Sequence, residues 1–115
     1  MNIFKYMLIV IGFGILSISN IGAQDLTKFG ALDAGQTKSV KVSLDKGKSV
    51  VSVYTMGESL LSCKFIDSSG NVGLEQKKVK RCRGESALNA PTDITVQITN
   101  EDSKPIEYRL HLQSN

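Results

Sequence analysis

The chain has 115 residues, a length that ordinarily corresponds to a single domain. Its formal net charge of +3 at pH 7 is too small to indicate nucleic-acid binding by itself. Two cysteines and one histidine are too few for the four ligands of a structural zinc site.

The first 23 residues have the three-part order of a secretory signal peptide. A short segment that carries Lys5 precedes an unbroken apolar run at residues 7–16, and a small, polar segment ends in Gly22–Ala23. The alternative is a membrane anchor, but a spanning helix needs about 20 apolar residues, twice the length of this run. We therefore expect cleavage near Gln24, a mature domain of residues 24–115, and no membrane span after cleavage.

Beyond residue 24, apolar and polar side chains alternate with a period of two, which is typical of strands that bury one face. Many of the apolar residues are β-branched, as strands prefer. The alternation predicts five clear strands, at residues 40–44, 51–54, 61–65, 94–98 and 106–112.

Turn signals separate these strands. The pattern Leu-Asp-x-Gly occurs at residues 32–35 and again at 44–47, and an Asp-Ser-Ser-Gly-Asn turn follows at 67–71. Short strands at roughly ten-residue spacing, with a turn after each, predict an all-β sandwich or a small barrel.

The segment 72–88 is the least regular part of the domain because it has few apolar side chains. We expect one or two edge strands there, joined by a polar excursion. Lysines on such strands prevent pairing with the edges of other sheets.

Both cysteines, Cys63 and Cys82, lie in the expected mature domain. An even pair in an exported protein predicts a disulfide, and a reduced pair is the alternative. Cys63 alternates in step with Leu61 and Phe65, which places it on the inward face of its strand. Closing this loop should stabilise the fold by roughly 3 kcal/mol.

The densest charged feature is a basic segment of five cations within seven positions around Cys82. It is typical of a patch for an anionic partner, such as a polysaccharide, a lipid head group or an acidic protein. The alternative is a solvated strand edge. No aromatic residue lies among the charges, so we expect no nucleic-acid partner. The five residues are Lys77, Lys78, Lys80, Arg81 and Arg83.

The sequence offers no recognisable catalytic or metal site. Its single histidine, His111, lies at an outward position of the last strand, and no serine has the G-x-S-x-G context of a nucleophile elbow. The turn at 67–71 has oxygen ligands but lacks the spacing of a calcium-binding EF-hand loop. We expect a protein that is not an enzyme and has no cofactor and no metal.

The order of turns and strands resembles that of bacterial pre-peptidase C-terminal domains. The resemblance extends from about Leu26 to Gln113 and implies a small jelly-roll-like antiparallel β-sandwich, usually attached to secreted proteases and other exported enzymes. It implies a non-catalytic domain, and some members bind calcium or an extracellular polymer. The segments that carry it are 32–37, 40–47, 67–71, 90–100 and 107–112.

The chain departs from that family in residues that bear on function. Residues 58–65 lack the acidic Asp-x-Asp lead of the family, which weakens the case for calcium. The Cys63–Cys82 pair and the basic segment are not family features either.

We therefore expect a secreted or periplasmic, non-catalytic binding or accessory module. Its partner would be an exported protein, or an anionic polysaccharide or other envelope surface. The alternative is an inhibitor or chaperone-like partner of one exported enzyme, with residues 77–83 as the contact.

Overall fold

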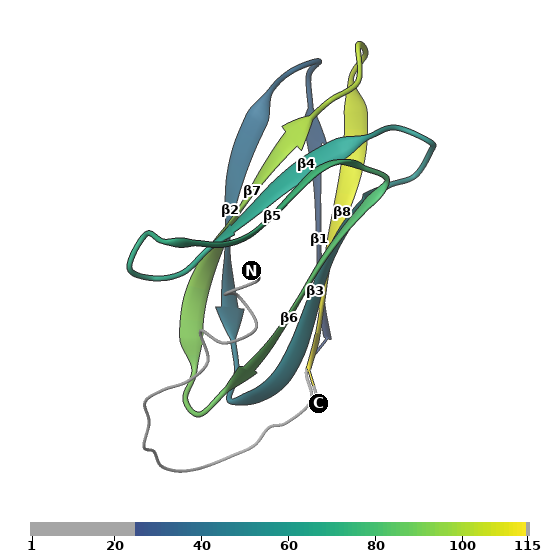
Figure 1. The fold of residues 1–115 in the computed structure, drawn as a ribbon. Helices are drawn as coiled ribbons and strands as arrows, with labels where there is room; N and C mark the ends of the chain where they lie inside the picture. Colours follow the sequence, from purple (N-terminus) through teal and green to yellow (C-terminus); the bar gives the residue numbers. More distant parts are fainter. Residues whose placement is uncertain (1–24, 115) are drawn as a thin grey trace.

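The computed structural model describes residues 25–114, which form eight strands in two antiparallel sheets (Figure 1). The predicted signal peptide, residues 1–23, lies outside the described residues, so its cleavage stays a prediction. No helix within 25–114 has the length and apolar character of a membrane span. The strands are β1 (Asp25–Leu32), β2 (Thr37–Leu44), β3 (Gly47–Thr55), β4 (Leu61–Ile66), β5 (Val72–Val79), β6 (Arg81–Leu88), β7 (Thr92–Asn100) and β8 (Ile106–Ser114).

The strand pairing is nested. Strand β1 pairs with β8, β2 with β7, β3 with β6, and β4 with β5. Further pairing of β3 with β8 and of β4 with β7 completes sheet A, in the order β1-β8-β3-β6, and sheet B, in the order β2-β7-β4-β5. Such nesting is the topology of a jelly roll, and the predicted jelly-roll-like β-sandwich is confirmed.

The period-two alternation of the sequence builds the core between the two sheets. Every second side chain is buried along β7 and β8, and the same pattern runs through β3 and β4. Because a slip of one residue would turn a whole apolar row toward water, this burial fixes the register of each strand. The largest fully buried side chains are Phe65, Leu32, Leu44, Leu61, Ile94, Ile98 and Leu110.

Strand β1 is not among the strands that the sequence predicts, because its apolar residues do not alternate cleanly. Leu32 is buried, whereas Phe29 on the opposite face is 69% exposed. An unbroken ladder to β8 holds the strand in place. Gly30 lies opposite Tyr108, and a Cβ at position 30 would come within 2.3 Å of the tyrosine hydroxyl, so the ring occupies the space of the missing side chain.

The segment 72–88 forms two edge strands, as expected, but they belong to different sheets. Strand β5 is an edge of sheet B, and β6 is an edge of sheet A. The polar connection between them is the single residue Lys80, and the chain changes sheets there (Figure 1). A β-bulge precedes the crossing, and its Lys78 takes the left-handed φ of 52°.

A buried amide, that of Asn100, closes the end of the sandwich where β1 leads into β2 and β7 into β8. This residue is 1% exposed, and its side-chain Oδ1 accepts the backbone N–H of Asp102 at 2.8 Å. Its Nδ2 donates to three backbone carbonyl groups, those of Leu32 at 3.3 Å, Asp33 at 3.1 Å and Lys104 at 2.9 Å.

Replacing this donor tests how much the amide stabilises the fold. Asn100→Asp keeps the size of the side chain but turns a carboxylate oxygen toward three carbonyl oxygens. We expect the free energy of unfolding to fall by about 2–4 kcal/mol, because the buried acceptors lose their donor. The control Asn89→Asp lies in an exposed turn and should change stability by less than about 0.5 kcal/mol. Equal denaturant midpoints for both variants would refute this role.

Candidate functional site

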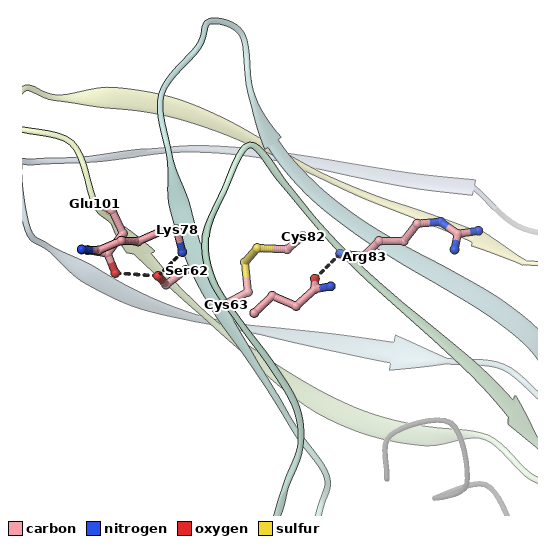
Figure 2. Close-up of a disulfide and its surroundings, with 7 residues drawn as sticks. Ser62, Cys63, Lys78, Cys82, Arg83 and Glu101 are labelled. Atoms are coloured by element: carbon pink, nitrogen blue, oxygen red, sulfur yellow. Dashed lines mark hydrogen bonds between the residues drawn. A yellow bond between two sulfur atoms is a disulfide. The ribbon is translucent and has the colours of Figure 1, made fainter. Parts of the chain in front are cut away.

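A disulfide ties the two sheets together beside the crossing (Figure 2). Cys63 on β4 is bonded to Cys82 on β6, and their Cα atoms are 6.2 Å apart, within the usual range for a disulfide. Both residues are buried. Since β4 lies in sheet B and β6 is the edge of sheet A, the bond fixes an edge strand of one sheet to an inner strand of the other. The disulfide predicted from the sequence is confirmed.

Side chains around the disulfide hold the backbones of β5 and β6 (Figure 2). The Gln76 Oε1 atom on β5 accepts the backbone N–H of Arg83 on β6 at 2.7 Å, which links the two edge strands. The Ser62 hydroxyl accepts the backbone N–H of Lys78 at 3.0 Å and donates to the Glu101 carboxylate at 2.5 Å. These bonds fix the bulge and the start of β6.

The basic segment lies on two faces of the molecule because the chain changes sheets within it. Arg81 and Arg83 flank the buried Cys82, so both point outward from sheet A. Lys77 points outward from sheet B and lines a hollow on that face. Lys80 is the crossing residue and is exposed. The five cations are therefore spread around an edge of the sandwich and do not form a single flat patch.

Within residues 25–114, three of the five cations have carboxylate partners. These ion pairs are exposed and therefore individually weak. The hydrogen bond and charge of Glu58 raise the pKa of Lys80, and Lys80 in turn lowers the pKa of Glu58. The pairs are Lys77–Glu75 at 3.7 Å, Lys80–Glu58 at 2.6 Å and Arg83–Glu85.

Arg81 has an aromatic partner instead of a carboxylate. Its guanidinium carbon lies 4.5 Å from the centroid of the Tyr54 ring, a cation–π distance. The register of β3 and β6 places Tyr54 directly opposite Arg81. The sequence gives no signal for this contact, because the two residues are far apart in the chain and meet only through strand pairing.

The hollow on the outer face of sheet B has a volume of about 390 Å³ and is open to solvent. Its lining includes Ser62, Lys64, Lys77, Gln97 and Thr99, and none of the described lining residues is aromatic. Small-molecule sites are mostly apolar and often aromatic, so this polar hollow differs from them.

The residues weighed as catalytic or metal-binding candidates have structural partners. The carboxylate of Asp67 caps its own turn by accepting the backbone N–H groups of Ser69 and Asn71, both at 2.9 Å. His111 lies on the outer face of sheet A, with its Nδ1 atom 3.0 Å from the Thr27 hydroxyl. Within residues 25–114, no group of three or more His, Cys, Asp or Glu side chains is arranged to hold a metal ion.

No family model and no curated protein sequence matches the chain. Solved structures do show a similar fold. A periplasmic inhibitor of g-type lysozyme from Aeromonas hydrophila is 14% identical, with a TM-score of 0.58 over 85% of this chain and 93% of that one. The pre-peptidase C-terminal domain of a Bacillus anthracis collagenase is 17% identical, with a TM-score of 0.57 over 76% of this chain and 88% of that one. The Yersinia pseudotuberculosis-derived mitogen is 12% identical, with a TM-score of 0.57 over 80% of this chain and 86% of that one.

These identities are low, so the similarities establish the β-sandwich fold and nothing finer. A pre-peptidase C-terminal domain is among the structural neighbours, in keeping with the resemblance seen in the sequence. Membership of that family remains a hypothesis, because no family model matches.

Reduction of the disulfide should destabilise the domain. The two cysteines are 19 positions apart, and opening a loop of this size costs about 3 kcal/mol in the chain-entropy model. For a domain of this length, that loss lowers the melting temperature by roughly 12–24 °C. The measurement is thermal unfolding with and without a reductant, and protein treated with an alkylating agent alone is the control, since the described residues include no free cysteine. An unchanged melting temperature after complete reduction would contradict the stabilising role.

Proposed function

We propose that this protein is an exported, non-catalytic module that binds an acidic surface of another exported protein, with the basic segment, residues 77–83, as part of the contact. One observation carries the proposal: the disulfide and its neighbouring hydrogen bonds hold the backbone that carries these cations along an edge of the sandwich. A fixed backbone reduces the entropy that is lost when a partner orders the side chains.

Export is supported by the three-part N-terminal sequence and by the disulfide, a bond typical of oxidising compartments. We propose that residues 1–23 are removed and that the module acts in the periplasm or outside the cell. A periplasmic inhibitor among the structural neighbours is compatible with this location.

The arrangement of the cations favours a protein partner over a polysaccharide. The cations extend around an edge from one outer face to the other, so a ligand must cover a curved surface to reach them all. Lys78 and Arg81 have no ion pair within the described residues, and the remaining three have exposed pairs that are open to exchange. The hollow beside Lys77 has no described aromatic ring on which a sugar would stack.

Inhibition of one exported enzyme is the second candidate function, and the fold shared with a lysozyme inhibitor favours it. In that case the module would block the acidic surface of the enzyme and would perform no chemistry itself. A g-type lysozyme is the first enzyme to test, because the Aeromonas hydrophila neighbour inhibits enzymes of that type.

The test removes charge from the basic segment. A quadruple variant carries Gln at Lys77, Lys78, Lys80 and Arg81, and we expect it to fold normally because these side chains are exposed. Its binding to partners in the native exported fraction should be weaker than that of wild type at low ionic strength. Wild-type binding should itself weaken as salt is added, since salt screens exposed charges.

A second quadruple variant, with Gln at Lys41, Lys46, Lys48 and Lys104, is the matched control. It loses the same number of charges from exposed positions outside the basic segment. Equal binding by wild type and both variants at two ionic strengths would overturn the proposed function. A g-type lysozyme assay with the same three proteins separates the inhibitor from a general binding module.

A further inference from the structure

The outer face of sheet A carries a row of alternating aromatic and arginine side chains that crosses all four strands. On β8, Arg109 lies opposite Phe29 of β1 on one side and opposite Tyr54 of β3 on the other. Tyr54 in turn lies opposite Arg81 of β6. We call Phe29, Arg109, Tyr54 and Arg81 the arginine–aromatic row. Local sequence patterns do not reveal it, because each member comes from a different strand.

Each arginine of the row contacts an aromatic ring. The guanidinium carbon of Arg109 lies 4.8 Å from the centroid of the Phe29 ring, and that of Arg81 lies 4.5 Å from the centroid of Tyr54. Neither arginine belongs to an ion pair within residues 25–114, and the buried Nε atom of Arg109 has no hydrogen-bond partner there. A stacked guanidinium still presents N–H groups at its rim, where they can bind a planar anion.

A second row lies beside the first on the same face. His111 of β8 is opposite Thr27 of β1 and Ser52 of β3, and Ser52 is opposite Arg83 of β6. Neither row contains an acidic residue. The nearest carboxylates on β8 and β6, those of Glu107 and Glu85, lie beyond the two rows on opposite sides. The cations therefore lie at the centre of the face and the carboxylates at its borders, with Arg83 paired to Glu85 across one border.

We propose that the outer face of sheet A is a docking surface for an acidic segment of the partner protein, whose carboxylates pair with Arg109 and Arg81. This inference rests on the proposed function and specifies the face and the chemistry of contact. Arg81 belongs to the basic segment as well, whereas Arg109, Tyr54 and Phe29 lie outside it.

Charge and geometry favour peptide carboxylates. The planar fork of a guanidinium matches a carboxylate with two parallel hydrogen bonds. The backbones of Arg109 and Arg81 are two strands apart, or about 10 Å, so each can take a separate carboxylate. Arginine and aromatic residues together are typical of the centres of protein interfaces. Phe29, 69% exposed, supplies the apolar part of the contact.

The stacking also disfavours a polysaccharide. One face of the Phe29 ring and one face of the Tyr54 ring are occupied by guanidinium groups, which leaves less ring surface for a sugar. The stacking restrains the arginine side chains before any ligand arrives, so less conformational entropy is lost on binding.

The experiment titrates isotope-labelled protein from the exported fraction with poly-L-glutamate, and separately with polygalacturonate at the same carboxylate concentration. Backbone and arginine side-chain NMR signals report where each polymer binds. We expect poly-L-glutamate to shift the signals of Arg109, Arg81 and Phe29, and polygalacturonate to bind at least several-fold more weakly.

Arg109→Gln should weaken binding of poly-L-glutamate by roughly tenfold or more, the usual effect of losing a charged hydrogen bond. Lys64→Gln, which removes one charge from the outer face of sheet B, should change it less than twofold.

Arg109→Lys keeps the charge and lacks the planar fork, so it should bind nearly as weakly as Arg109→Gln. Melting temperatures of the variants establish that they are folded.

Shifts of NMR signals confined to Lys77, Lys78 and Lys80 would overturn this inference and leave the proposed function standing. Equal or tighter binding of polygalacturonate on the same face would overturn the commitment to a protein partner. The absence of binding by either polymer would overturn this inference, and the partner assays with the quadruple variants would then decide the proposed function separately.

Discussion

The crossing of the chain between the two sheets at Lys80, held by the Cys63–Cys82 disulfide, is the constraint on which the functional surfaces depend. Within residues 25–114, strands β5 and β6 are both edges, and each pairs with one neighbouring strand. Edge strands with exposed, charged side chains bury little apolar surface, so their own packing holds them weakly. The disulfide compensates by fixing β6 to β4, an inner strand of the opposite sheet.

The position of β6 determines where the charges point. Because Cys82 is drawn into the core, Arg81 and Arg83 must face outward from sheet A, and Arg81 lies against Tyr54. On the other side of the crossing, Lys77 faces outward from sheet B. The crossing thus divides a basic segment that is continuous in the sequence between two faces, and the disulfide holds β6 beside it. On the outer face of sheet A, Arg81 and Arg83 therefore lie together with residues from β1, β3 and β8.

The sequence predicts the features that depend on local alternation. The inward positions of Leu61, Cys63 and Phe65 and the outward position of His111 follow from the period of two, and the structure agrees. The edge character of 72–88 follows instead from its few apolar side chains, and the structure agrees there too. Strand β1 cannot be predicted from the sequence because the ladder to β8, rather than its own pattern, holds it in the sheet. The arginine–aromatic row cannot be predicted for the same reason, since each contact depends on which strands are neighbours and in which register. Strand pairing of this kind is not visible in the sequence of a single segment.

Amide hydrogen exchange of the oxidised and the reduced protein tests most directly whether the disulfide holds the crossing. Exchange reports local opening free energies residue by residue. The account predicts that reduction lowers protection most in β5 and β6, including the N–H groups of Lys78 and Arg83 that bond to Ser62 and Gln76. The central strands β7 and β8 should retain most of their protection. Unchanged protection in β5 and β6, or an equal loss in all eight strands, would contradict the central claim.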